Sequence, residues 1–174
     1  MRAVARYRIV PERSKVFISA RSSLHPIDTR TDGLEGFVDF ELHGGGRLNL
    51  TVPTKGRVSL PVARMSSGNP LEDRELRRRI EARRYPTIDG ELTDMHETGR
   101  DGRYLVRGDV TFKGATRSYQ DEMAVSQDDD GTLRLSGEST FDIRDFGMDP
   151  PRILMLKVEP QVGVRVEIVA EREG

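Results

Sequence analysis

Cysteine is absent from this sequence of 174 residues. Its absence excludes disulfide bonds, thiol catalysis, cysteine-ligated zinc and iron–sulfur clusters. No apolar run approaches the roughly 18 residues of a membrane-spanning helix, so we expect no stable membrane insertion. Neither sign of charge dominates, since 28 Lys and Arg stand against 29 Asp and Glu, for a formal net charge of -1. This balance argues against a globally basic nucleic-acid-binding protein and against an acidic disordered tail.

The chain is expected to form one domain over residues 1–174. Its mass of 19.6 kDa fits a single domain, and Gly and Pro are spread along the chain, so no segment resembles a flexible linker. No internal repeat of fixed period is found. The first seven residues contain no apolar signal core and no cleavage pattern. A cytoplasmic protein is therefore the expectation.

Apolar and polar residues alternate at period two along most of the chain, the pattern typical of half-buried β-strands. Hairpin-length turn signals lie between the alternating segments and indicate antiparallel pairing. These signals are Gly44–Gly46, Lys55-Gly56, Arg100–Gly102, Lys113-Gly114 and Asp128–Gly131. The alternating sets are Val16, Ile18, Ala20; Leu34, Val38, Phe40, Leu42; Leu48, Leu50, Val52; Val58, Leu60, Val62; Tyr104, Val106, Gly108, Val110, Phe112; Leu133, Leu135, Phe141, Ile143; and Val162, Val164, Val166, Ile168.

One segment breaks this period and predicts a helix of about 14 residues. Asn69 suits the N-cap position, and Pro70 suits the first helical position. Leu76 and Ile80 then lie four residues apart, on one face. We expect the helix to stop at Tyr85, since a residue before proline avoids the helical region. Eight to nine amphipathic strands with one helix predict a closed antiparallel barrel, with a two-sheet sandwich as the alternative.

Four blocks of sequence, in order along the chain, resemble the YceI-like, lipocalin-like family of polyisoprenoid-binding proteins. The stretch from Gly68 to Leu76, followed by Tyr85-Pro86-Thr87-Ile88, is similar to the family's "N…RD..L…YP.I" signature. The opening segment 7–16, the hairpin 106–117 and the turn Asp145-Phe146-Gly147 resemble its other blocks. One departure is Ile143, where the family usually carries Arg; the nearest basic residue here is Arg144. The resemblance implies an all-β, antiparallel eight-stranded lipocalin-like β-barrel with one short helix after the middle strands.

Catalytic and metal-binding motifs are not found in the sequence. The three histidines, His25, His43 and His96, show no spacing that pairs a base with a nucleophile. His43 and His96 are expected at loop tips, and His25 in a loop or at the rim of the barrel. The run Asp128–Gly131 is interpreted as a hairpin turn, since a calcium loop needs alternating ligands and a Glu at its twelfth position. No catalytic residue, metal or cofactor is predicted.

Six arginines crowd the predicted helix and the residues that follow it: Arg74, Arg77, Arg78, Arg79, Arg83 and Arg84. A positively charged helix could hold a pyrophosphate head group, an anionic membrane or nucleic acid. Interleaved aromatic residues for base stacking are lacking except Tyr85, so nucleic acid is not expected as a partner. A solvated helix, with Glu72, Asp73, Glu75 and Glu81 offsetting part of the charge, is the favoured interpretation.

The inward face of the predicted barrel is almost entirely apolar. Periodicity alone favours a filled core, whereas the resemblance implies a tunnel for a long-chain lipid. The leading hypothesis is a non-enzymatic carrier, without cofactor, of a polyisoprenoid or similar amphiphilic lipid. The alternatives are an enzyme acting on such a lipid, with His25, Asp145 or Arg144 near the mouth, and a structural or partner-binding barrel without ligand. The residues predicted to line the barrel are Val16, Ile18, Val38, Phe40, Val58, Leu60, Leu76, Ile80, Tyr104, Val106, Gly108, Val110, Phe112, Leu135, Phe141, Ile143, Val164 and Val166.

Overall fold

Eleven strands form one antiparallel sheet that closes on itself, in a computed structural model that describes residues 3–150, 152–153 and 155–174. The order β1-β4-β5-β6-β7-β8-β9-β11 is closed by pairing of β1 with β11, which confirms the barrel and excludes the sandwich. The bounds are β1 Ala5–Ile9, β2 Lys15–Ser22, β3 Ile27–Thr31, β4 Glu35–Phe40, β5 Lys55–Pro61, β6 Thr87–Glu97, β7 Arg103–Phe112, β8 Ala115–Gln127, β9 Leu133–Asp142, β10 Arg152–Ile153 and β11 Leu156–Arg172.

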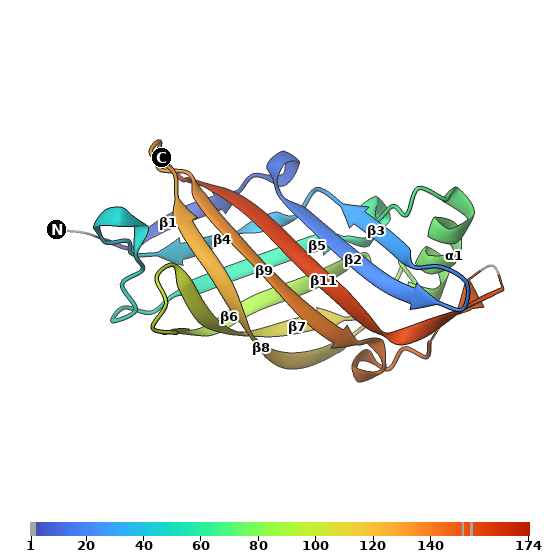
Figure 1. The fold of residues 1–174 in the computed structure, drawn as a ribbon. Coiled ribbons are helices and arrows are strands. Elements are labelled where there is room, and N and C mark those ends of the chain that lie inside the picture. Colours follow the sequence, from blue (N-terminus) through green and yellow to red (C-terminus); the bar gives the residue numbers. More distant parts are fainter. Residues whose placement is uncertain (1–2, 151, 154) are drawn as a thin grey trace.

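The barrel has eight strand positions because two of them are shared by pairs of short strands. The long strand β11 pairs along one edge with β9, and along its other edge first with β2 and then with β1. A 3-10 helix, Pro11–Arg13, interrupts the line between β1 and β2. The second shared position holds β3 and β4, because β3 pairs with β2 and β4 pairs with β1. Figure 1 shows both chain termini at one end of the barrel and α1 at the other.

The single α-helix, α1 (Pro70–Ile80), begins as predicted and ends earlier than predicted. The Asn69 side chain accepts hydrogen bonds from the backbone N–H groups of Leu71 and Glu72, at 3.0 and 3.3 Å. Glu81 adopts the left-handed conformation, with φ 58°, and its carboxylate lies 3.4 Å from Lys113 Nζ. The predicted length of 14 residues is therefore wrong. The left-handed Glu81 ends the helix after 11 residues, four residues before Tyr85, where the prediction had placed its end. In the part of the chain that the structure describes, no helix is long and apolar enough to cross a membrane.

The segment between β4 and β5 corrects three sequence predictions. Leu48, Leu50 and Val52 alternate but form no strand, and Lys55-Gly56 lies inside β5 and is not a turn. Leu42 and Leu48 make only an isolated bridge, and Leu48 is buried. The segment crosses the end of the barrel and plugs it. Its apolar side chains therefore pack into that end and do not form one face of a paired strand. Gly44–Gly46 forms a 3-10 helix in this segment and is not a hairpin turn between two strands. The predicted turns at Arg100–Gly102, Lys113-Gly114 and Asp128–Gly131 are confirmed.

His96 lies within β6 and not at a loop tip, which corrects the prediction.

Strands β6 and β8 show no clear alternation of apolar and polar residues in the sequence, for two different reasons. A bulge between Leu92 and Asp94 shifts the register of β6 against β7 and breaks the alternation. Strand β8 places polar side chains on its inward face as well as its outward face, so its alternation is hidden.

Buried side chains gather in two main clusters inside the barrel. The first fills the end near the chain termini and includes Tyr7, Phe40, Leu48 and Leu133. The second lies beneath α1 and comprises Val62, Met65, Ile80, Phe112, Phe146 and Met148. Phe112 and Phe146 pack edge to face there, with ring centroids 5.7 Å apart. The interior between the two clusters is where a cavity can form.

Candidate functional site

A cavity of about 420 Å³ occupies the barrel interior, a volume within the range of small-molecule sites. Its wall includes side chains from β2 through β9, from β11 and from α1, and it is overwhelmingly apolar. The predicted lining residues that do line it are Val16, Ile18, Val38, Phe40, Val58, Leu60, Leu76, Ile80, Val106, Gly108, Val110, Phe112, Leu135, Phe141, Ile143, Val164 and Val166. Tyr104 is the exception. The interior is thus a cavity and not the filled core that periodicity alone favoured.

Tyr104 lies beyond the cavity because the end of the barrel near the chain termini is plugged. It is buried, and its hydroxyl accepts a hydrogen bond of 3.0 Å from the backbone N–H of Leu48. Leu133 and Ala170 are fully buried at the same end and do not border the cavity. Alternation had identified the face on which Tyr104 lies but not its height along the barrel axis.

The opposite end of the cavity is covered by α1 and by the turn after β9 rather than by the strands of the barrel wall. Leu76 and Ile80 of α1 border the cavity, together with Phe146 and Met148 from the turn after β9. That turn is the predicted Asp145-Phe146-Gly147 block, and Gly147 ends it in the left-handed conformation, with φ 71°. Leu76 also packs against the Ile27, Leu156 and Val158 cluster. A ligand reaching the cavity at this end would meet α1 first.

Glycines on three adjacent strands make room on one side of the cavity. Gly56 on β5 and Gly108 on β7 are the cross-strand partners of Leu92 on β6. Gly90 on β6 is the cross-strand partner of Val58 on β5 and of Val110 on β7. A Cβ atom at Gly108 would lie 3.0 Å from the Glu91 carbonyl oxygen, and one at Gly90 would lie 2.8 Å from a Val58 methyl. A side chain at Gly90 or Gly108 would crowd these neighbours, so the wall at the two positions is formed by backbone.

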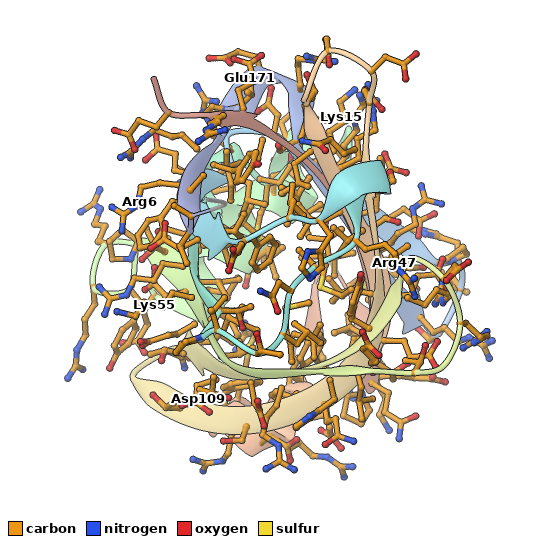
Figure 2. All side chains as sticks on the ribbon, turned by 90° about the vertical axis from the view of Figure 1, so that its left-hand side faces the viewer. Arg6, Lys15, Arg47, Lys55, Asp109 and Glu171 are labelled. Atoms are coloured by element: carbon orange, nitrogen blue, oxygen red, sulfur yellow. The ribbon has the colours of Figure 1, made fainter. Side chains whose placement is uncertain are left out.

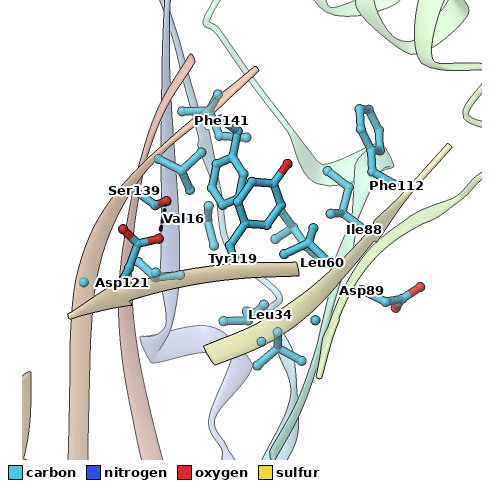
Figure 3. A pocket seen from close by; sticks show the side chains of 18 of the residues that line it. Val16, Leu34, Leu60, Ile88, Asp89, Phe112, Tyr119, Asp121, Ser139 and Phe141 are labelled. Carbon is cyan, nitrogen blue, oxygen red and sulfur yellow. Dashed lines mark hydrogen bonds between the residues drawn. The ribbon is translucent and has the colours of Figure 1, made fainter. Parts of the chain in front are cut away.

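Polar groups interrupt the apolar wall at Asp121 and Ser139, which the sequence analysis does not predict as lining residues. Asp121 of β8 and Ser139 of β9 both border the cavity, and Ser139 Oγ donates a 2.6 Å hydrogen bond to Asp121 Oδ2 (Figure 3). The signal was present in the order Tyr119, Asp121, Met123, Val125, where an Asp takes a place in an otherwise apolar inward row. The alternation of β8 had not been recognised, so the inward position of this Asp was missed.

Tyr119 of β8 borders the cavity, against the cluster beneath α1 (Figure 3). Its ring packs edge to face on Phe141, with centroids 4.6 Å apart, and its hydroxyl donates to Asp145 Oδ2 at 3.2 Å. Desolvation and the neighbouring Asp145 carboxylate raise the pKa of Tyr119 to about 12. The phenol therefore stays neutral at physiological pH and acts as a hydrogen-bonding group, not as a base.

The residues considered for catalysis do not assemble into a reactive group. The His25 ring Nδ1 lies 3.0 Å from the Pro26 carbonyl, and Ser22 Oγ donates to the His25 backbone carbonyl, not to the ring. Arg144 pairs with Asp142 at 2.6 Å, and His96 pairs with Asp94 at 2.7 Å on the surface. Among residues 3–150, 152–153 and 155–174, no group of three His, Asp or Glu side chains is placed to hold a metal ion.

The arginines of α1 are mostly solvent-facing, and two of them share one carboxylate. Arg78 Nη2 and Arg79 Nε lie 2.5 and 3.3 Å from Glu75 Oε1. The hydrogen bond from Arg78 holds the pKa of Glu75 below its ordinary value. The Arg84 guanidinium lies 5.1 Å from the centroid of the Tyr85 ring. These contacts fit the solvated-helix interpretation for the arginines and Glu75, and they bring no α1 arginine into the cavity wall. The interpretation is wrong for Glu72 and Asp73, which are buried; Asp73 Oδ1 accepts hydrogen bonds from the backbone N–H and the hydroxyl of Ser67.

Comparison with known proteins agrees with this architecture. Solved structures with the same fold include BcnA of Burkholderia cenocepacia, with a TM-score of 0.78 and 16% identity, covering 93% of this chain and 99% of that one. A polyisoprenoid-binding domain from Saccharophagus degradans, implicated in plant cell wall breakdown, gives a TM-score of 0.77 and 12% identity over 98% of this chain and 100% of that one. A YceI protein of Campylobacter jejuni gives a TM-score of 0.68 and 15% identity, covering 85% of this chain and 86% of that one.

A search of curated proteins finds no match. The YceI-like domain, in contrast, matches residues 7–170, nearly the whole chain. The match spans the predicted opening strand, the helix signature, the hairpin and the late turn. Because it extends from β1 to β11 of the closed barrel, the predicted family is confirmed, and the chain belongs to the YceI-like family.

Proposed function

We propose that this protein is a non-enzymatic binding or carrier protein for a polyisoprenoid or similar long-chain amphiphilic lipid, held in the barrel cavity. The observation that carries the proposal is the cavity of about 420 Å³ with an almost wholly apolar wall. Each CH₂ group moved from water into such a wall contributes about 0.8 kcal/mol before the costs of binding. A branched hydrocarbon chain gains most from this surface, because it has no polar groups along its length to desolvate.

The family and one structural relative support the same ligand class. The Saccharophagus domain, which shares the fold, is described as polyisoprenoid-binding. The cavity here also has an elongated apolar wall, reaching from Leu34 and Phe40 near the plugged end to Leu76 and Ile80 of α1. A chain-like ligand, rather than a compact one, suits a lumen bounded at such separated points of the barrel.

Native mass spectrometry on protein purified without detergent tests this function. A bound mass of several hundred daltons that organic solvent removes is the expected result. A clean unliganded mass, together with no thermal shift on adding geranylgeraniol, would overturn the proposal in favour of a ligand-free structural barrel. Turnover of an added isoprenoid diphosphate, lost in His25→Ala, would overturn the non-enzymatic role instead.

A further inference from the structure

Of the described acidic residues that border the cavity, Asp121 is the one whose carboxyl group faces inward (Figure 3). Its Oδ2 atom accepts the hydrogen bond from Ser139 at 2.6 Å. Within the described part of the chain, no donor is hydrogen-bonded to the other carboxyl oxygen, Oδ1. A carboxyl oxygen without a donor in apolar surroundings is costly, so a ligand that supplies a donor there gains affinity.

In the part of the chain that the structure describes, no basic side chain forms an ion pair with this carboxyl group inside the barrel. Arg57 is the basic residue that borders the cavity among the described residues, but its side chain is exposed and lies 3.8 Å from Glu91 on the outer face. The other acidic residues at the wall belong to the outer surface; Glu122, for example, pairs with Arg100 and Arg103 there. Arg117 of β8, opposite Val110, also lies on the inward face of the strand, but it is exposed and does not border the cavity. Among the described residues, the ionisable side chains that border the cavity and point into it are thus Asp121 and the neutral Tyr119.

We propose that the lumen selects long-chain ligands whose polar end is a hydrogen-bond donor, a hydroxyl or an amine, bound at Asp121, and that it rejects anionic ends such as phosphate. This selectivity rests on the lipid-binding function proposed above and names its ligand class. A hydroxyl donates to the free carboxyl oxygen. A phosphate that entered the lumen would lose its hydration, which is costly unless a cation or hydrogen-bond donors replace the water. The group it would meet is instead the carboxyl group of Asp121. An isoprenoid phosphate could then bind only with its phosphate outside the lumen.

The test compares three probes that share one hydrocarbon chain: geranylgeraniol, its methyl ether and geranylgeranyl phosphate. Calorimetric titration of the native protein is expected to give an affinity about tenfold higher for the alcohol than for the ether, the size of one hydrogen bond to a buried acceptor. The phosphate is expected to bind more weakly than the alcohol. In Asp121→Val the alcohol should lose its advantage over the ether, because the acceptor is gone.

The chain offers a matched control on the outer face of the barrel. Asp109 of β7 accepts a hydrogen bond of 2.6 Å from Ser118 of β8, the same kind of pair at the same length as Asp121 with Ser139. Asp109→Val should keep the native preference for alcohol over ether. Asp121→Asn keeps the shape of the side chain and an acceptor oxygen, so it should retain the alcohol preference while the phosphate gains affinity relative to the alcohol. This variant reports on the charge even if the valine variant does not fold.

The outcomes separate this inference from the proposed function. Equal affinities for alcohol and ether in the native protein, or an unchanged phosphate-to-alcohol ratio in Asp121→Asn, would overturn the selectivity at Asp121 and leave lipid binding intact. Failure of all three probes to bind would overturn lipid binding itself. An alcohol preference lost equally in Asp109→Val and Asp121→Val would show that the carboxyl groups act through stability and would also overturn the inference.

Discussion

The two ends of the barrel differ in how they treat apolar side chains. At the end near the chain termini, Leu133 and Ala170 are 0% exposed and Phe40 is 1% exposed. At the α1 end Val62 is also 0% exposed, beneath the helix. The same end, however, carries exposed apolar side chains: Leu24 in the β2–β3 turn is 82% exposed, Leu71 in the first turn of α1 61%, and Met155 in the β10–β11 turn 93%. Figure 2 looks onto the end near the chain termini, where the polypeptide crosses the barrel.

This difference assigns the two ends different tasks. The plugged end is close-packed and holds the barrel shut, so its residues act through stability. The α1 end is covered by a short helix and two turns that bear exposed apolar side chains. The buried cluster beneath α1 must part for a ligand to enter, but one short helix and the turn after β9 cover it instead of paired strands. We therefore expect ligands to pass at the α1 end.

The largest effect is expected from Phe112→Asp beneath α1. Phe112 is buried against Phe146, and an aspartate there would lose the aromatic packing and bury an unpaired charge. We expect a loss of more than about 4 kcal/mol in the free energy of unfolding, measured by urea denaturation, or failure to fold. Thr111→Asp, one residue earlier and on the exposed face, should change stability little. Similar losses in both variants would mean that the register of β7 differs by one residue.

Leu133→Ala should show that the plugged end holds the barrel together. Removing a fully buried leucine side chain leaves a cavity and typically destabilises by about 2–5 kcal/mol. Leu24→Ala at the opposite end should change the free energy of unfolding by less than about 0.5 kcal/mol, because its side chain is already in water. Chemical denaturation of both variants measures the difference. Equal effects would contradict the contrast between the two ends.

Asn69→Ala tests how firmly α1 covers the cavity. The substitution removes the acceptor for the Leu71 and Glu72 N–H groups and should destabilise by about 1 kcal/mol. Asn69→Asp keeps an acceptor and is the control. Because α1 covers the open end, the alanine variant should also release bound lipid faster, measured by stopped-flow displacement. An unchanged release rate despite the lower stability would mean that α1 is not on the exit path.

The smallest effect is expected from replacing Arg77, Arg78 and Arg84 together with Gln. Exposed ion pairs contribute about 0–1 kcal/mol, and Arg78 pairs only with the Glu75 carboxylate of the same helix. Thermal unfolding and the affinity for geranylgeraniol should therefore barely change. A selective loss of isoprenoid phosphate binding that shrinks at high salt would instead identify a head-group site on α1, because exposed charges are screened within about 10 Å at 0.1 M salt. A loss for the alcohol would mean that the helix shapes the cavity through Leu76 and Ile80.

Much of the barrel could be predicted from sequence because alternation reports which face of a strand a residue occupies. Val16, Val164 and Phe112 all line the cavity as predicted. Alternation does not report height along the barrel, so Tyr104 was placed in the cavity although it belongs to the plug. It also does not distinguish a strand from a plug, which is why Leu48, Leu50 and Val52 were assigned to a strand.

The parts of the site that escaped prediction depend on cross-strand neighbours. Asp121 is recognisable as an inward residue only once β8 is paired with β7, opposite Val106, and beside Ser139 of β9. The early end of α1 depends on the left-handed Glu81 and its tertiary contact with Lys113, which no local rule supplies. The open volume beside Gly90 and Gly108 also appears only when three strands lie side by side.

The most direct test of the lipid-binding account fills the cavity from within. Val164 of β11 lies opposite Ser139 and Ile18 and borders the cavity. Val164→Phe should lower the affinity for geranylgeraniol about tenfold or more in calorimetric titration, while the unfolding free energy changes by less than about 1 kcal/mol, because the ring enters open space. Ser136→Phe, which adds the same ring to the outer face of β9, should leave the affinity unchanged. Full affinity in Val164→Phe would contradict binding in the lumen, and a destabilisation of about 1–3 kcal/mol, typical of overpacking, would contradict the open cavity.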